Sequence, residues 1–351
     1  MSELQERINA AKKQLEGLRN DIENTKKSKT DRTLYETLSL RSNTSQPLPL
    51  LRTRRVLRGH FGKVYASCWS GDSTHLVSAS QDGKLMVWNG FTTNKVQSIP
   101  LASSWVITCA YEQSVNRLVA CGGMDNTCSL YKVDMTASNR VIRVSQELSG
   151  HLGYLSSCTF LGEGQILTAS GDSTCNLWDI EKGRPVSIFR DHSADVMSVS
   201  VSNHDPHMFV SGSCDALALV WDIRSGQSVM TFRGHSSDIN AVAFFPDGRA
   251  VGTGSDDHSC RIFDMRCVNE LAVLGGDKII SGITSVSFSR SGRVLFAGYE
   301  DFAVRGWDLA APSPSMACAL TLTGHENRVS SVGVNLEGNA LLTGSWDTLL
   351  R

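Results

Sequence analysis

The stretch Ser170–Ile180 reads SGDSTCNLWDI, a tight turn followed by an apolar strand. Its turn residue Asp172 precedes Trp178 by six positions. The same turn recurs every 42–47 residues, at Asp82, Asp125, Asp172, Asp215, Asp257, Asp301 and Asp347. The first six are each followed, six residues later, by a large aromatic residue: Trp88, Tyr131, Trp178, Trp221, Phe263 and Trp307. Self-similarity at a fixed period of this length predicts a repeat architecture.

A histidine marks five of the seven repeats. It lies 21–23 residues before the turn Asp, at His60, His151, His192, His235 and His325. The second and sixth repeats carry Ser103 and Ile279 there instead. Apolar strands flank each turn, and four short strands per period are typical of a β-propeller blade. The sequence therefore predicts an all-β fold, a seven-bladed propeller over residues 52–351.

The recurring His, Asp and Trp can form one buried hydrogen-bonded chain per blade together with a strand Ser or Thr. Such a chain is structural, because a buried polar group left unpaired costs about 1–3 kcal/mol. A Ser-His-Asp hydrolase is the alternative interpretation. We reject it, since an enzyme needs one site and this set recurs with constant spacing. No nucleophile elbow, phosphate loop or zinc motif is present. The sequence thus predicts neither an enzyme nor a cofactor.

The ten cysteines occur singly, and none forms a CxxC pair. We therefore expect no metal site and a cytoplasmic chain with reduced thiols. The sequence shows no secretory signal, no long apolar run and no prenylation box, so a membrane anchor would belong to a partner. Residues 1–55 hold twelve Lys or Arg against seven Asp or Glu, which we interpret as a solvated tail. We expect no nucleic-acid partner.

Residues 1–25 predict a helix with a heptad seam. The apolar positions are separated by alternating steps of four and three residues, at Leu4, Ile8, Ala11, Leu15, Leu18 and Ile22. Three heptads are marginally stable alone in water, so the seam indicates a coiled coil with another chain. A helix folded back on the propeller and a disordered tail are the alternatives. Residues 26–51 are interpreted as a linker or short helix.

The motifs "LWDI" at Leu177–Ile180 and "VWDI" at Val220–Ile223 identify WD repeats. A heptad helix followed by seven such repeats resembles the β subunit of heterotrimeric G proteins. Several short sequence motifs resemble those of that family and occur in the same order along the chain: "RTRRVLRGH", "VSASQDGKL", "TTNK", "SSWV", "HSSDIN", "GITSVSFSRSGR" and "GSWD". The alternative function is that of a generic WD-repeat adaptor in another multiprotein complex, but such an adaptor would need neither the N-terminal helix nor these motifs.

The resemblance implies a scaffold at the inner face of the plasma membrane, held there by lipidated partners. It would bind a γ subunit permanently through the helix and the propeller side. It would bind a GDP-bound α subunit across one propeller face, engage effectors after α leaves, and meet the receptor indirectly. The implied α- and effector-binding residues are Lys63, Tyr65, Lys84, Met86, Lys95, Ser104, Trp105, Met124, Asn126, Tyr154, Asp195, Met197, Asp238, Asn240, Asp256 and Trp346.

The closing repeat contains the stretch Gly344–Arg351, GSWDTLLR. The aromatic expected six residues after Asp347 would fall at position 353, so we expect a truncated closing blade and a natural chain that continues by a few residues. The resemblance implies that this blade takes its outer strand from residues 52–59, RTRRVLRG, and its inner three from the last repeat.

Overall fold

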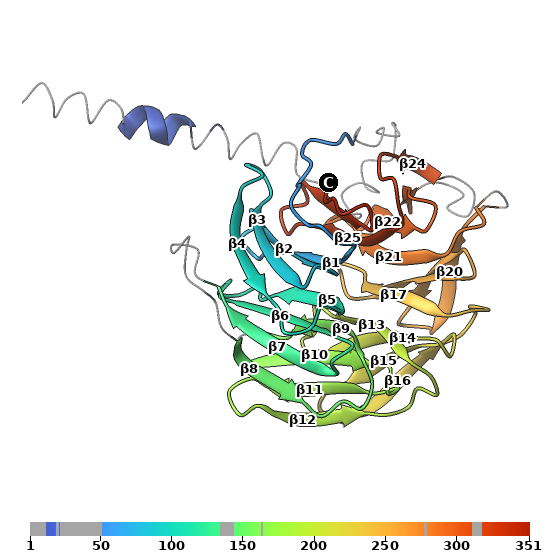
Figure 1. The fold of residues 1–351 in the computed structure, drawn as a ribbon. Helices are drawn as coiled ribbons and strands as arrows, with labels where there is room; N and C mark the ends of the chain where they lie inside the picture. The colour runs from blue at the N-terminus through green and yellow to red at the C-terminus, as the bar shows by residue number, and fades with distance from the viewer. Residues whose placement is uncertain are drawn as a thin grey trace, which may run out of the picture.

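The computed structural model describes residues 12–18, 21, 51–133, 144–162, 164–276, 279–310 and 318–351. Its strands follow one another around a common centre, so that the first and last repeats meet (Figure 1). Blade 1 comprises β1 (Val64–Trp69), β2 (His75–Ser80), β3 (Lys84–Asn89) and β4 (Lys95–Pro100). Blade 2 comprises β5 (Val106–Tyr111), β6 (Leu118–Gly123), β7 (Thr127–Lys132) and β8 (Val144–Ser149). Blade 3 comprises β9 (Leu155–Phe160), β10 (Gln165–Ser170), β11 (Cys175–Asp179) and β12 (Arg184–Phe189).

The second half of the ring repeats this order. Blade 4 comprises β13 (Val196–Val201), β14 (Met208–Ser213), β15 (Ala218–Asp222) and β16 (Gln227–Phe232). Blade 5 comprises β17 (Ile239–Phe244), β18 (Ala250–Ser255), β19 (Cys260–Asp264) and β20 (Asn269–Leu274). Blade 6 comprises β21 (Ile283–Phe288), β22 (Val294–Tyr299), β23 (Val304–Asp308) and β24 (Cys318–Leu322). The last repeat forms a two-stranded closing sheet, β25 (Val329–Val334) and β26 (Leu341–Ser345).

The described part of the chain therefore shows six four-stranded blades, and the prediction of seven is wrong in this respect. The reason lies in the pairing of the closing sheet. Leu57 pairs with Leu350, with an N–O distance of 2.9 Å, and Leu350 bridges to Gly344. Single bridges do not extend into strands, so residues 51–57 and 349–351 add no third or fourth strand. The N-terminal segment nevertheless meets the last repeat where we expected it.

The closing sheet still joins the two ends of the ring. On one side, the Val332 amide donates to Ser285 of β21 over 3.0 Å. On the other, the Trp69 indole of β1 donates to the Gly333 carbonyl over 3.1 Å. The second strand of each blade is almost wholly buried, because apolar side chains of the adjacent blades cover it from both sides. Burial of each Leu, Ile or Val contributes about 1.5–3 kcal/mol, so the core is spread between blades.

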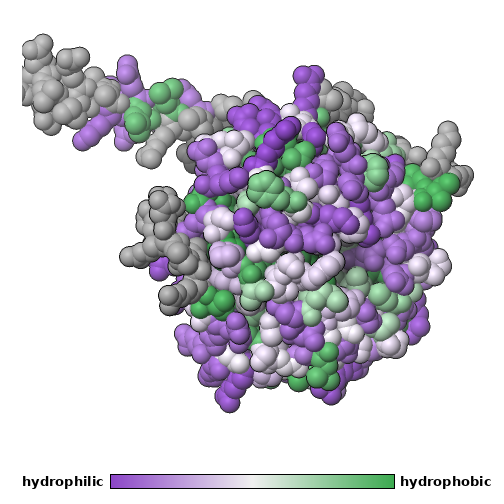
Figure 2. Space-filling model, viewed as in Figure 1, coloured by the Kyte–Doolittle hydropathy of each residue, from purple (hydrophilic) through white to green (hydrophobic). Residues whose placement is uncertain are grey.

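The N-terminal helix is described over residues 12–18 and extends away from the propeller (Figure 1). Leu15 and Leu18 are 57% and 63% exposed. Figure 2 shows both hydrophobic and hydrophilic colour on this segment. Leu4, Ile8, Ala11 and Ile22 lie outside the described residues. No coiled coil is confirmed, and the partner helix stays a prediction. None of the described helical residues forms a segment long and apolar enough to cross a membrane.

Candidate functional site: the turn face of the propeller

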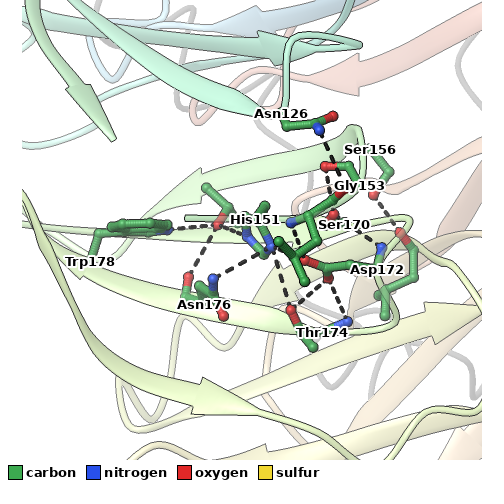
Figure 3. Close-up of polar contacts among 12 residues, drawn as sticks. Asn126, His151, Gly153, Ser156, Ser170, Asp172, Thr174, Asn176 and Trp178 are labelled. Carbon is green, nitrogen blue, oxygen red and sulfur yellow. Dashed lines mark hydrogen bonds and ion pairs between the residues drawn. The ribbon is translucent and has the colours of Figure 1, made fainter. Parts of the chain in front are cut away.

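The recurring polar set meets inside each marked blade, as Figure 3 shows for blade 3. His151 places Nδ1 2.9 Å from Asp172 and Nε2 2.8 Å from the Thr168 hydroxyl. The Trp178 indole donates to the same hydroxyl over 2.8 Å. Asp172 also accepts the Leu152 amide over 2.9 Å. The set therefore ties the loop before the blade, its second strand, its turn and its third strand together.

The same connections recur in blade 1 through His60, Ser78 and Trp88, and in blade 4 through His192, Ser211 and Trp221. His235 contacts Thr253 in blade 5, where Phe263 replaces the indole, and His325 contacts Thr343 in the closing sheet. Blades 2 and 6 lack the histidine, and their turn Asp residues have other hydrogen-bond or ion-pair partners. In blade 6, Asp301 pairs with Arg305 at 2.5 Å.

The electrostatics of these sets favour a structural role. Burial lowers the pKa of His151, so its imidazole stays neutral. Burial alone would raise the pKa of Asp172, but hydrogen bonds from Thr174, the Leu152 amide and His151 outweigh it and lower that pKa to about 2. The Thr168 hydroxyl is fully buried and already bonds both the imidazole and the indole. It can reach no substrate, so the set cannot act as a hydrolase triad.

The turns define one face of the propeller, called the turn face here: the ends where the first strands begin and the second strands end. The residue directly before each first strand faces this surface, and these residues differ strongly in type. They are Lys63, Trp105, Tyr154, Asp195, Asp238, Gly282 and Arg328. Ser104, Met124, Asn126, Asp256 and Trp346 lie in loops at the same ends, and Tyr65, Lys84, Met197 and Asn240 lie in the first residues of their strands.

The basic side of the turn face is built around Trp346. Lys63 places Nζ 4.2 Å from the Trp346 ring centroid, and the Arg328 guanidinium lies 5.0 Å from it. The Tyr65 ring packs edge-on against the indole, with centroids 5.8 Å apart. Arg328 also pairs with Glu300 at 2.9 Å. Contacts of this kind hold an aromatic ring in one orientation at the junction of blade 1 and the closing sheet.

The acidic side lies across blades 4 and 5. Tyr154 donates its hydroxyl to Asp195 over 2.9 Å and lies 3.5 Å from the Met197 sulfur. Asn240 donates to Asp256 over 2.5 Å and to the Ile283 carbonyl over 2.9 Å, which links blade 5 to blade 6. The turn face is therefore basic on one side and acidic on the other, a pattern that orients a charged partner.

Comparison with known proteins assigns this architecture. The G protein beta WD-40 repeat family model matches residues 1–351. A guanine nucleotide-binding protein subunit beta of Dictyostelium discoideum is 51% identical over 350 residues, covering 100% of this chain and 99% of that protein. The G(I)/G(S)/G(T) subunit beta-1 of Homarus americanus is also 51% identical over 350 residues, covering 98% of both.

The chain belongs to the G protein beta WD-40 repeat family. Members of this family are non-enzymatic propellers. The absence of enzymatic activity in the family agrees with the strand hydroxyls, which are buried and already hydrogen-bonded. The identity of the two relatives assigns the function class, signal transduction by a G protein beta subunit.

Apolar side chains stand out on the turn face of this G protein beta family member. Trp105 is 52% and Met124 57% exposed. Two more exposed residues, Phe61 and Leu152, lie outside the predicted binding set. Each directly follows a marker histidine, where other repeats carry Ser193, Ser236 or Glu326, and this contrast was the available signal.

Two residues placed on the interface by resemblance lie elsewhere. Met86 is 4% exposed and packs with Trp69 and Trp88, so it offers no surface to a partner. Lys95 begins β4 and pairs with Trp88, four residues along β3 from Lys84. At about 3.3 Å per residue, its backbone lies about 13 Å along the strand from Lys84, and its side chain crosses over Gly59 rather than standing among the turns. Conversely, the prediction did not include Arg328, although Arg328 occupies the position before β25 that Asp238 occupies before β17.

A second candidate surface lies at the opposite ends of the strands. A cavity of about 380 Å³ opens on blade 5 next to blade 6. Its apolar wall includes Phe245, Ile262, Leu271 and Leu309. Asp264 and Arg266 form an ion pair of 2.6 Å at its border. Such a pocket suits a bulky apolar side chain flanked by polar groups.

Proposed function

We propose that this chain is the β subunit of a heterotrimeric G protein, which binds a GDP-bound α subunit on the turn face. Once α leaves, the same face engages effectors, and receptor signalling passes through this exchange. The observation that carries the proposal is the exposed Trp105 on a face that is charged with opposite signs on its two sides. Exposed aromatic anchors and complementary charge are what a specific protein interface requires.

The proposed α- and effector-binding set keeps the fourteen residues that lie on the turn face. Arg328 joins them because it stacks on Trp346 beside Lys63. Met86 is left out of the set, because it is buried in the core that blade 1 shares with the last repeat. Phe61 and Leu152 extend the apolar part of the interface, since both are almost fully exposed beside predicted contacts.

The proposed γ subunit binds permanently to two places. Residues 1–25 supply the apolar seam of a coiled coil. Two residues of this seam, Leu15 and Leu18, are exposed to solvent in the described helix. The cavity on blade 5 receives an apolar side chain of the same partner on the propeller side, because its wall is apolar and open to solvent. Residues 26–51 would link these two contacts, and residues 52–351 would form the propeller.

The membrane association that we propose is peripheral. A lipid carried by the γ or α subunit would hold the complex at the inner face of the plasma membrane. One lipid chain alone gives only marginal and reversible membrane binding, so a second attraction is needed for stable anchoring.

The test is nucleotide-dependent binding. The chain is co-expressed with a γ subunit, and its affinity for an α subunit is measured by fluorescence titration with GDP and with a non-hydrolysable GTP analogue. We expect tight binding with GDP and at least about 100-fold weaker binding with the analogue, the upper end of ordinary allosteric coupling. Equal affinity in both nucleotide states would contradict the proposal. Failure to co-purify any γ chain would contradict its γ part alone.

A further inference from the structure

A strip of five cations runs along the edge where the ring closes, at Arg52, Arg54, Arg55, Arg58 and Lys95. All five are exposed. None forms an ion pair with another residue that the structure describes. The N-terminal four belong to the extended segment whose Leu57 pairs with Leu350. The strip therefore lies on the ordered body of the propeller and is not a freely moving tail.

Two contacts assemble the strip. Arg55 donates its Nε to the Phe91 carbonyl over 3.0 Å, which fixes the segment against the turn between β3 and β4. The Lys95 side chain crosses directly over Gly59, where an added Cβ would clash with it, and its Nζ lies 5.6 Å from the Trp88 ring centroid. Lys95 is thus brought next to Arg58, its neighbour on the strip.

An exposed aromatic residue borders these cations. Phe91, whose carbonyl holds Arg55, is 47% exposed. No acidic residue stands in the stretches 51–60 and 91–95 that carry these cations, so none there would orient a specific ligand. Exposed cations of like charge beside an exposed aromatic ring suit the surface of an anionic bilayer, where cations lie among headgroups and rings enter the interface.

We propose that this strip docks the propeller on anionic phospholipid headgroups. The inference rests on the proposed function only for its location beside a membrane. It supplies the second attraction that a single partner lipid lacks, because a lipid chain plus a basic patch anchors stably where either alone does not. The strip also orients the propeller, with its closing edge toward the bilayer. An acidic polypeptide is the competing ligand that the experiment must separate.

The experiment is co-sedimentation of the full chain with vesicles. The chain is made in a bacterial host, which adds no prenyl group, so that binding cannot come from a partner lipid. Vesicles of pure phosphatidylcholine are compared with vesicles containing about 30% phosphatidylserine, at about 0.1 M and about 0.5 M salt. We expect binding that requires phosphatidylserine and weakens at high salt.

The test variant is Arg52→Gln, Arg54→Gln and Arg58→Gln together, which spares the Arg55 contact. Its matched control changes three exposed arginines on other blades, Arg184→Gln, Arg190→Gln and Arg233→Gln, for the same loss of charge. Each strip arginine should contribute about fivefold to vesicle partitioning, so the triple variant should lose about 100-fold. The control should keep the wild-type value, and both should melt at the wild-type temperature.

Three results would overturn the proposal. Wild-type chain could bind both vesicle types equally, or the strip variant and its control could lose binding alike. The strip variant could also lose binding to polyglutamate while binding phosphatidylserine as before, which would assign the strip to an acidic polypeptide. Nucleotide-dependent α binding and γ co-purification are measured separately, so failure of the strip and failure of the proposed function give different readouts.

Discussion

The Lys63 ammonium lies 4.2 Å from the centre of the Trp346 ring and joins the first and last repeats at the surface of the propeller. Tyr65 and Arg328 hold the same indole from two other directions. The residues that close the ring are therefore also residues of the proposed interface, so stability of the closing sheet and partner binding are coupled there.

This coupling predicts a measurable interaction energy. In a double-mutant cycle of Lys63→Met and Trp346→Leu, urea unfolding should give a coupling of about 0.5–1 kcal/mol, as expected for an exposed cation on an indole. The matched cycle pairs Lys84→Met with Trp346→Leu, because Lys84 makes no described contact with the indole. Coupling equal in the two cycles would show that the Lys63 contact contributes nothing specific.

Trp105→Ala should weaken binding of GDP-bound α by about 2–4 kcal/mol, the loss typical of a central aromatic anchor. The thermal midpoint should barely change, since half of the side chain is already exposed to water. Titration calorimetry and a thermal melt measure the two effects. Trp69→Ala is the opposite control, because Trp69 is 7% exposed and its loss should destabilise the fold. A large fall in midpoint for Trp105→Ala with unchanged affinity would assign it to packing.

Leu15→Asp with Leu18→Asp should abolish γ co-purification, because each substitution places an unpaired charge on the proposed seam. The control variant, Lys13→Asp with Gln14→Asp, alters the same helix away from that seam and should retain γ. Gel filtration and mass spectrometry of the purified complex provide the measurement. Normal γ content in the leucine variant would defeat the coiled-coil interpretation.

Asp172→Asn should lower the free energy of unfolding at pH 7 by about 1–3 kcal/mol, because His151, Thr174 and the Leu152 amide lose a charged acceptor. The pKa of Asp172 is depressed to about 2 in the folded chain, against about 3.9 when unfolded. Its contribution is therefore complete above pH 4 and is lost as the pH falls from about 4 to about 2.

Urea unfolding across this pH range tests the sign. The difference between wild type and Asp172→Asn should shrink as the pH falls. Asp125→Asn is the control, since this turn belongs to a blade without a marker histidine and the side chain is exposed. A gap that stays constant down to pH 2 would show that the ionised carboxylate is not the stabilising form.

Much of this fold follows from short sequence patterns that recur at a fixed interval along the chain. The spacing from Asp172 to Trp178 and from His151 to Asp172 predicted the blades and the polar set of the five repeats that carry the histidine. These contacts join residues of a single repeat, so the sequence of one repeat is enough to predict them. The same spacing distinguished Trp105 and Trp346 from the buried Trp88, Trp178, Trp221 and Trp307, because neither occupies the position six residues after a turn Asp.

The tertiary structure decided what depends on neighbouring blades. Met86 is buried in the cluster that blade 1 shares with Leu342 and Leu350 of the last repeat, and no local pattern records that packing. Lys95 lies beside Arg58 because β4 runs back along β3 and carries its side chain over Gly59. The closing repeat forms two strands because Leu57 and Leu350, from opposite ends of the ring, pair at a single point. The sequence by itself determined the repeat, its turns and its hydrogen-bonded sets. Which side chains are left exposed, and which cations gather at one edge, follows only from packing between blades, since burial is a property of the surfaces that the ring brings together.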